Sequence, residues 1–235
     1  YIMDRKGFFN IFMALQPTPS DAVNPQLSRG TLKTYKGKWD NPDIIYFLKR
    51  TMFGAKPGDV AFFKALSFKQ AINKILDASP ILKTTPINNY NNDQITDEDV
   101  PMGSTWVKSI SKTGKLNKRR RDSYKQWWIG NMVNQERNIS EKMVLFWHNH
   151  FATETHVVDN AIYCFQHNQL LHQFALGNFK EMVKAVTTDL SMLRYLNGNA
   201  NSKKAPDENY ARELQELFTV GKGPDSKYTE ADVKA

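Results

Sequence analysis

Two histidines that flank an asparagine are the side chains in this sequence best suited to chemistry. His148, Asn149 and His150 lie inside the otherwise apolar run of residues 144–151. Such a run is expected to be buried, and buried polar groups require hydrogen-bond partners. An imidazole changes charge near neutral pH and is a common metal ligand. The segment therefore indicates either a polar site or a pair of structural histidines that fix the orientation of a helix.

The spacing of the two histidines argues against a metal ion shared between them. On an α-helix, residues two apart point about 200° from each other around the axis, so both rings reach one ion only where the helix has ended. We therefore expect no zinc or iron bound by His148 and His150 together. The consecutive letters also spell the name of a nuclease motif, but those nucleases disperse the three residues over a hairpin and a helix.

A second group of ionisable residues lies on a predicted helix, residues 208–219. One side of this helix is polar and the opposite side is apolar. If the polar side meets water, each of its i, i+4 ion pairs stabilises the helix by only about 0.2–0.5 kcal/mol. If it faces the histidines instead, the two segments form a pocket suited to acid–base chemistry or to a metal. The candidate pocket consists of His148, Asn149, His150, Arg212, Glu213 and Glu216. We expect Arg212 and Glu213 to make the contact.

Three further residues on the predicted helix 159–176 could take part in chemistry. His167 falls at the centre of the apolar face, where a lone histidine is predicted to be a core residue with satisfied hydrogen bonds. Cys164 and His167 stand at i, i+3, which allows a nucleophilic pair, but no third orienting group is identifiable. His172 falls on another face of the same helix.

The densest positive charge lies in residues 112–125, directly before Trp127 and Trp128. Basic residues beside aromatic ones can grip phosphates and stack on bases. No recognised nucleic-acid module surrounds the run, however, so it is interpreted as a solvated loop that leads into a helix with core tryptophans. Nucleic acid is therefore not the expected partner.

The composition indicates a globular chain with a sizeable core. Hydrophobic residues make up 40% of the 235, and 32 Lys+Arg against 24 Asp+Glu give a net charge of +8, which favours an anionic polymer or a protein partner. A single cysteine excludes an intrachain disulfide and leaves the compartment open. No run approaches the roughly 18 apolar residues of a membrane span. Residues 4–15 are predicted to form an amphipathic helix, with an export signal as the alternative.

Helical signals recur along most of the chain, whereas no strand alternation and no fixed repeat is present. The predicted helices cover residues 43–53, 59–67, 68–77, 122–134, 138–151, 159–176, 179–187, 191–196 and 208–219, with another opening at Thr229. Asn138 and Glu141 have the spacing of a capping box, and Asn178 and Asp189 are predicted helix caps. Because this last helix meets the end of the sequence and the chain opens on Tyr1, we expect the protein to continue beyond both ends. The fold class is all-α. We predict an N-terminal helical part (1–80), an irregular connection (81–118) and a main helical domain (119–235).

Several long motifs resemble a bacterial family, the domain of unknown function 1800. The motifs are FLKRTMFGA at 47–55, PGDV at 57–60, the tryptophan pair at 127–128, EKMVLFWHNHFAT at 141–153, NQLL at 168–171, ALGNF at 175–179 and NYARELQELFT at 209–219. The resemblance implies no established activity, and it leaves the cofactor unknown. It implies a larger protein, often exported, and often encoded beside a sulfatase-like or phosphatase-like partner.

Two positions depart from the family pattern. Phe174 stands where members often carry histidine, and Asp207 where they often carry asparagine. If a family site uses that histidine, this protein lacks it.

Two functional hypotheses follow. The first is a cell-envelope protein with a His/Glu/Arg pocket and hydrolase-like activity on a polymer. The second is a non-catalytic binding or assembly protein whose buried histidines are structural. Hydrogen-bond contact between a histidine of the 148–150 segment and Glu213 or Glu216, beside an accessible cleft, would discriminate between them.

Overall fold

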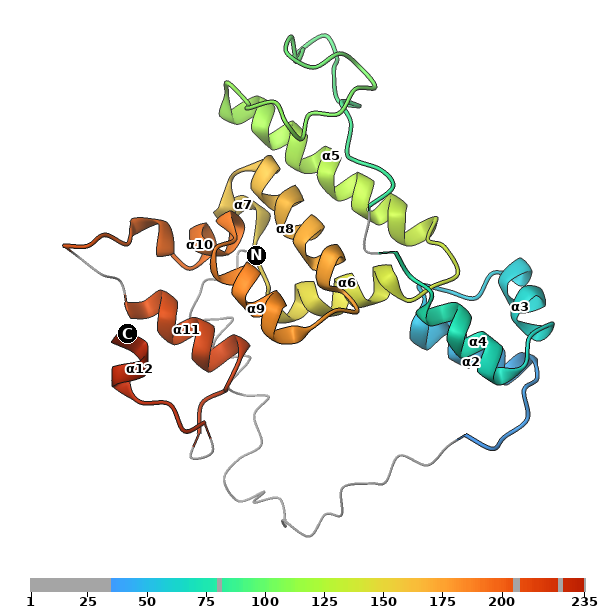
Figure 1. Cartoon of the computed structure of the whole chain (residues 1–235). Coiled ribbons are helices and arrows are strands. Elements are labelled where there is room, and N and C mark those ends of the chain that lie inside the picture. The colour runs from blue at the N-terminus through green and yellow to red at the C-terminus, as the bar shows by residue number, and fades with distance from the viewer. Residues whose placement is uncertain (1–34, 80–81, 205–207, 224–225, 235) are drawn as a thin grey trace, which may run out of the picture. The chain divides into compact units, whose positions relative to one another are not determined.

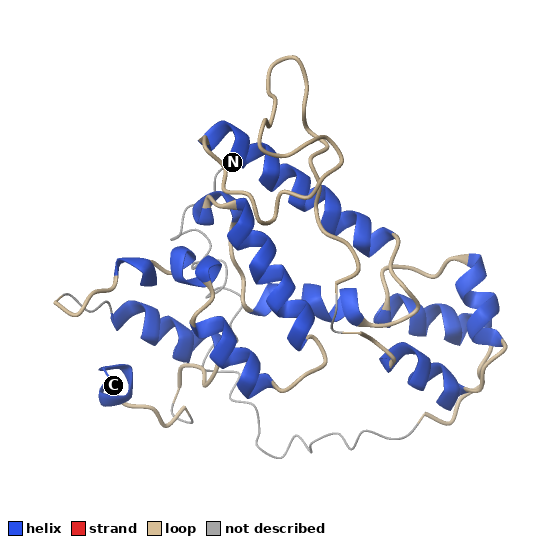
Figure 2. Ribbon diagram, turned by 45° about the horizontal axis from the view of Figure 1, so that its top comes forward, coloured by secondary structure: helices blue, strands red, loops and turns tan. Residues whose placement is uncertain are grey.

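The computed structural model describes the whole chain except residues 1–34, 80–81, 205–207, 224–225 and 235. The chain divides into two units, Tyr1–Lys38 and Trp39–Ala235, and the second contains all the helices discussed below. The helix predicted at residues 4–15 lies outside the described residues. In the described part, helices are joined by loops, and the only β-structure consists of isolated bridges (Figure 2). The all-α prediction is confirmed.

Three short helices open this unit: α2 (Asn41–Thr51), α3 (Pro57–Lys64) and α4 (Phe68–Leu76). All three were expected, but α2 and α3 each begin two residues earlier than predicted. The reason is a proline in the first turn, where its missing N–H costs nothing and its fixed φ suits the helix. Ser67 and Gln70 form a capping box at the start of α4. The three helices share a core that includes Ile44, Leu48 and Phe63.

The segment between α4 and the next helix has no helix of its own, yet it is held by buried contacts. Trp106 is fully buried, and its indole N–H donates to the Ser123 hydroxyl at 3.2 Å. Asn88 is buried and donates to the carbonyl of Val100 at 2.8 Å. This segment is therefore part of the packing of the unit, although it is irregular as expected.

Helix α5 (Gly114–Val133) corrects the interpretation of the basic run as a solvated loop. The helix begins at Gly114 instead of residue 122, because Thr113 caps it by accepting a hydrogen bond from the Leu116 N–H. Arg120, in the middle of the run, is fully buried and donates to Asp97 Oδ2 at 2.9 and 2.7 Å. The partner carboxylate, Asp97, is distant in the sequence, so the residues around the run do not indicate this pairing. Part of the run is therefore buried instead of solvated.

The remaining helices are α6 (Ser140–His150), α7 (Thr155–Val158), α8 (Ala161–Phe174), α9 (Phe179–Thr187), α10 (Leu190–Tyr195), the 3₁₀ turn η2 (Gly198–Ala200), α11 (Glu208–Phe218) and α12 (Glu230–Lys234). Asn178 and Asp189 cap α9 and α10 as predicted. Asp159 does not start α8: it has a left-handed φ of 45° at the end of α7, and Asn160 is the cap. Asn138 does not form a capping box with Glu141; it accepts from the Ser140 N–H instead.

Helix α8 is the centre of the packing, in contact with α5, α6, α7, α9 and α10 (Figure 1). One core cluster joins it to α6, α9, α10 and α11 around Phe151, Leu171 and Met182. A second cluster joins it to α5 and the irregular segment around Trp106 and Phe165. Among the described residues, no helix combines the length and apolar character that a membrane crossing needs. The three-part domain division remains a prediction.

Candidate functional site

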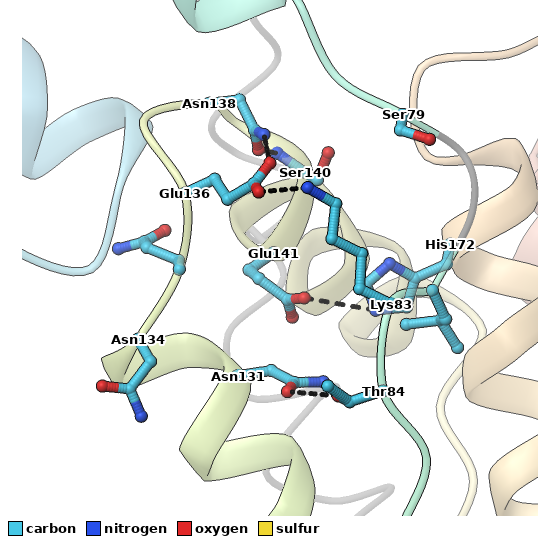
Figure 3. A pocket seen from close by; sticks show the side chains of 12 residues that line it. Ser79, Lys83, Thr84, Asn131, Asn134, Glu136, Asn138, Ser140, Glu141 and His172 are labelled. Atoms are coloured by element: carbon cyan, nitrogen blue, oxygen red, sulfur yellow. Dashed lines mark hydrogen bonds and ion pairs between the residues drawn. The ribbon is translucent and has the colours of Figure 1, made fainter.

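A pocket of about 260 Å³ lies where the irregular segment passes the loop between α5 and α6 (Figure 3). Its described lining comes from Ser79 and residues 82–84, the end of α5, the α5–α6 loop, the first turn of α6 and the last turn of α8. The lining residues are Ser79, Leu82, Lys83, Thr84, Asn131, Asn134, Gln135, Glu136, Asn138, Ser140, Glu141 and His172. Leu82 is the only aliphatic residue among these, and the others have polar or ionisable side chains.

Glu141 and His172 form a carboxylate–imidazole pair in this lining. The Oε1 atom of Glu141 lies 3.5 Å from Nε2 of His172, and both side chains are mostly buried, with exposed fractions of 12% and 5%. Neither Glu141 Oε2 nor His172 Nε2 makes a hydrogen bond of normal geometry. Buried polar atoms in this state are uncommon in folded proteins. The pair therefore retains unused hydrogen-bonding capacity, although these atoms are themselves buried in the wall of the pocket.

Burial shifts the two pKa values in opposite directions and reverses their order. Desolvation raises the pKa of Glu141 to about 7, and the neighbouring Trp128 indole offsets only part of this rise. Desolvation also lowers the pKa of His172 to about 4. Glu141 lies in the first turn of α6 and His172 in the last turn of α8, where the helix dipoles favour the charged forms by about 0.3–1 kcal/mol. A pKa change of this size corresponds to roughly 3 kcal/mol, so desolvation outweighs the dipoles.

The loop that carries the pocket is fixed at both ends. The Ile139 N–H donates to the carbonyl of Ile75 at 2.9 Å, which ties the start of α6 to α4. Asn138 is buried, accepts from Ser140 N–H at 3.0 Å and donates to Glu136 at 3.4 Å. Glu136 in turn pairs with Lys83, which reaches it from the irregular segment (Figure 3). These contacts position the carboxylate of Glu141 without occupying it.

His148 lies in a row of polar and aromatic side chains between α5, α6 and α8. Its ring packs edge-on against Trp128, with 4.8 Å between the ring centroids, and 5.9 Å from His167. Burial, together with the charge that His167 would carry, lowers the pKa of His148 to about 4. Asn168, one turn before His172, is fully buried, and neither of its amide atoms makes a hydrogen bond of normal geometry. Polar groups therefore continue from the pocket into the interface of α5, α6 and α8.

His167 has the structural role predicted from its position on the apolar face. It is 1% exposed, its Nδ1 lies 2.9 Å from Asp189 Oδ2, and its Nε2 lies 3.1 Å from the carbonyl of Phe151. The neighbouring Cys164 is buried, which raises the pKa of its thiol to about 11. Because His167 uses both ring nitrogens elsewhere, it provides no base for that thiol.

The six residues of the predicted pocket fall into separate groups of contacts. His148 packs with α5 and α8, as described above, and Asn149 is exposed. His150 Nε2 lies 2.7 Å from the carbonyl of Phe218, so this histidine does meet the end of α11. Phe151, after it, is fully buried as expected, whereas Trp147 is only partly buried.

The polar side of α11 makes its described contacts with α12 and the segment before it. Arg212 donates two hydrogen bonds of 2.7 Å to Glu230, a geometry typical of bidentate ion pairs. Glu216 accepts from the Tyr228 hydroxyl and lies 3.5 Å from Lys222. Glu213 is half-buried on the same helix. Arg212 is therefore engaged away from the 148–150 segment, because α12 offers it a carboxylate.

The pair with the strongest signs of chemistry, Glu141 and His172, was not among the predicted site residues. The sequence predicts a capping role for Glu141 and places His172 on a side face of its helix. They lie on different helices that approach through α6–α8 packing. Their spacing in the sequence carries no signal, but one local clue existed: Glu141 and His148 are seven residues apart, on one face of α6.

The geometry also bears on metal binding. Within the described residues, no group of three or more His, Cys, Asp or Glu side chains is placed to hold a metal ion. The Glu141–His172 pair supplies two such side chains, while Glu136 is engaged with Lys83. Acid–base chemistry is what this arrangement can perform with its own groups.

Comparison with known proteins places the chain in a family. No curated protein and no solved structure matches it. A sequence model of the family described as "Protein of unknown function (DUF1800)" matches residues 46–235, from within α2 to the end of the chain. This range contains every residue of the pocket and the whole α5–α12 region. The chain therefore belongs to the DUF1800 family.

Proposed function

We propose that this protein is a hydrolase-like enzyme of the cell envelope that acts on a polymer, with Glu141 as its general acid–base residue and His172 as the partner of that carboxyl group. One observation carries the proposal. A carboxylate and an imidazole with unused hydrogen-bonding atoms approach to 3.5 Å, and both residues line a pocket.

The protonation states suit proton transfer at neutral pH. With its pKa raised to about 7, Glu141 is present both as a carboxylate, which can take a proton from water, and as an acid, which can protonate a leaving group. His172, whose pKa is lowered to about 4, stays neutral over this range and can accept a hydrogen bond from the protonated carboxyl. The pair therefore keeps one proton available close to the ligand.

The test is a release assay on purified envelope polymers, such as peptidoglycan and envelope polysaccharide, scored by new chain ends. We expect Glu141→Gln to remove activity while circular dichroism shows the wild-type helix content. If Glu141 acts as a base in the slowest step, the rate rises with pH through about 7. Glu181→Gln, an exposed glutamate on α9, is the matched control. Full activity of Glu141→Gln would refute the catalytic role.

The envelope location is supported by the family resemblance, since members are often exported. Fractionation of cells that produce the full-length protein, followed by immunodetection, tests it. Recovery in the periplasmic or envelope fraction is the expected result, and recovery with cytoplasmic markers would contradict it.

The alternative is a non-catalytic binding or assembly protein whose histidines are structural. Its specific support is His167, whose two ring nitrogens are engaged by Asp189 and the Phe151 carbonyl. A protein of this kind would bind its partner equally well with glutamate or glutamine at position 141, and would release no chain ends from any polymer.

A further inference from the structure

The lining of the pocket carries information about the ligand as well as about catalysis. Four carboxamide side chains, from Asn131, Asn134, Gln135 and Asn138, stand together with the side chains of Ser79, Thr84 and Ser140. Each carboxamide offers both donors and an acceptor, and each hydroxyl offers both at one atom. A lining of this composition matches a ligand that presents donors and acceptors in turn around its surface.

Three of these carboxamides have hydrogen-bonding capacity left over. Asn131 uses its oxygen to accept from the Thr84 hydroxyl at 3.2 Å, which leaves its amide N–H groups for a ligand. Asn134 donates to the carbonyl of Gly130 at 3.1 Å, which leaves its oxygen. The Gln135 oxygen is buried and has no partner. The Thr84 hydroxyl is itself fixed, because it accepts from the Trp127 indole at 2.9 Å.

The charges of the lining disfavour an anionic ligand. Among the described residues of the lining, Lys83 is the only Lys or Arg, and Glu136 already neutralises it. An anion would also meet the carboxyl group of Glu141, beside which His172 is a neutral neighbour at ordinary pH. Like-charge approach in a partly buried site is unfavourable. The pocket is therefore suited to an uncharged ligand.

A peptide is also a poor match. Extended peptides are commonly bound by adding a strand to a sheet edge, and the described residues contain no sheet. Helical peptides are bound through apolar anchors in a groove, whereas Leu82 is the one aliphatic side chain among the lining residues that the structure describes. The volume, about 260 Å³, is at the small end of ligand pockets, which span about 300–1,000 Å³. One sugar ring is a ligand of suitable size.

We infer that this pocket binds a neutral saccharide unit, with hydroxyl groups contacting the carboxamides of Asn131 and Asn134 beside Glu141. The inference rests on the proposed function for its setting, because it names the substrate class of the same site. It would make the polymer of that reaction an uncharged glycan. Hydrogen-bonding sites of this kind reject analogues that lack the matching hydroxyl, since a buried polar group would then remain unpaired.

The test uses the full chain and measures binding by titration calorimetry with cellotetraose and chitotetraose. Pentaglycine and a tetramer of galacturonic acid serve as the peptide and anionic comparators. We expect one neutral tetrasaccharide to bind and both comparators to fail.

Pocket variants locate the binding. Asn131→Ala should weaken it about tenfold, the loss expected for one hydrogen-bonding side chain, and Asn131→Asp should do the same without creating a cavity. Asn89→Ala is the control, because Asn89 also makes one side-chain hydrogen bond, to Gln126 at 2.8 Å, outside the pocket. Equal affinity of Asn131→Ala, Asn131→Asp and Asn89→Ala would overturn the inference.

The outcomes separate the inference from the proposed function. Saccharide binding that depends on Asn131, without hydrolysis of any glycan, would leave the inference standing and remove the enzymatic role. Hydrolysis of another polymer that depends on Glu141, without binding of either tetrasaccharide, would leave the enzymatic role and remove the saccharide.

Discussion

Two carboxylate–imidazole pairs lie on neighbouring helices of this protein, and they differ in what surrounds them. His167 and Asp189 are 2.9 Å apart in the core; His167 also meets the Phe151 carbonyl, and Asp189 accepts from the Met192 N–H. Glu141 and His172 are 3.5 Å apart in the wall of a pocket and keep unpaired atoms. The same residue types therefore form a fixed structural contact in one place and an unsatisfied site in another.

The number of hydrogen-bond partners, more than the residue types, distinguishes structural histidines from candidate catalytic ones. A fully hydrogen-bonded buried pair rigidifies its surroundings, whereas a partly satisfied one costs free energy that the fold must supply elsewhere. Asp189 also caps α10, so its carboxylate has a second structural task. Glu141 has no comparable task, since its expected capping role is absent.

The largest expected effect is on the structural pair. Asp189→Ala removes a helix cap and leaves His167 without its partner, and we expect it to lower the free energy of unfolding by about 2–4 kcal/mol. Urea denaturation followed by circular dichroism measures this loss. Asp77→Ala, at an aspartate whose side chain is 77% exposed, should change stability by under about 0.5 kcal/mol. A comparably small loss at Asp189 would break the distinction between the two pairs.

The second prediction concerns the pH dependence that Glu141 contributes. Its pKa rises from 4.5 to about 7 on folding, so the folded state holds this proton more tightly. The resulting stability is fully present below pH 4.5 and is lost as the pH rises through about 7. Glutamine carries no such proton. Relative to wild type, Glu141→Gln should therefore gain stability over this range, by on the order of 3 kcal/mol.

Urea denaturation of both proteins at about pH 5 and about pH 8 gives the difference. Glu181→Gln, on the exposed face of α9, is the control for a solvated glutamate. A constant difference between wild type and Glu141→Gln at the two pH values would mean that the carboxyl group is not desolvated, and the contrast with Asp189 would lose its basis.

The third prediction addresses His148 and His172 directly. Burial lowers the pKa of both rings to about 4, from an ordinary value of 6.5. The sign is opposite to that of Glu141: the unfolded chain binds these protons first, so stability falls as the pH drops from 6.5 through about 4. NMR titration of the ring C–H signals, assigned with His148→Gln and His172→Gln, should give midpoints near 4. Midpoints near 6.5 would place both rings in water.

The elements of the fold were accessible from the sequence wherever the signal was local. Asn178 and Asp189 caps, and glycine or proline beyond helix ends, reflect the hydrogen-bonding needs of one helix, so they are readable without tertiary structure. Arg120 shows the opposite case. Its charge predicted an exposed side chain, but Asp97, distant in the sequence, pairs with it in the interior.

The candidate site was less accessible, for a physical reason. Residues 148–150 stand out because polar letters interrupt an apolar run, and the structure gives them three different environments: the aromatic row, solvent and the end of α11. Glu141 and His172 stand out only through desolvation and missing partners, which are properties of packed helices. A sequence states which groups can titrate, whereas the neighbours that shift their pKa come from helix packing.

The smallest expected effect is at the edge of the pocket, where Lys83 and Glu136 join the irregular segment to the α5–α6 loop. Their side chains are 67% and 57% exposed, so water screens the attraction and the two long chains lose entropy on pairing. Lys83→Met should therefore change the free energy of unfolding by under about 1 kcal/mol. The matched control is Lys184→Met, because Lys184 pairs with Glu181 at a similar exposure of 61% and 54%. A loss at Lys83 several times that at Lys184 would show that this ion pair holds the pocket together. The pocket would then have a structural role, like the His167–Asp189 pair.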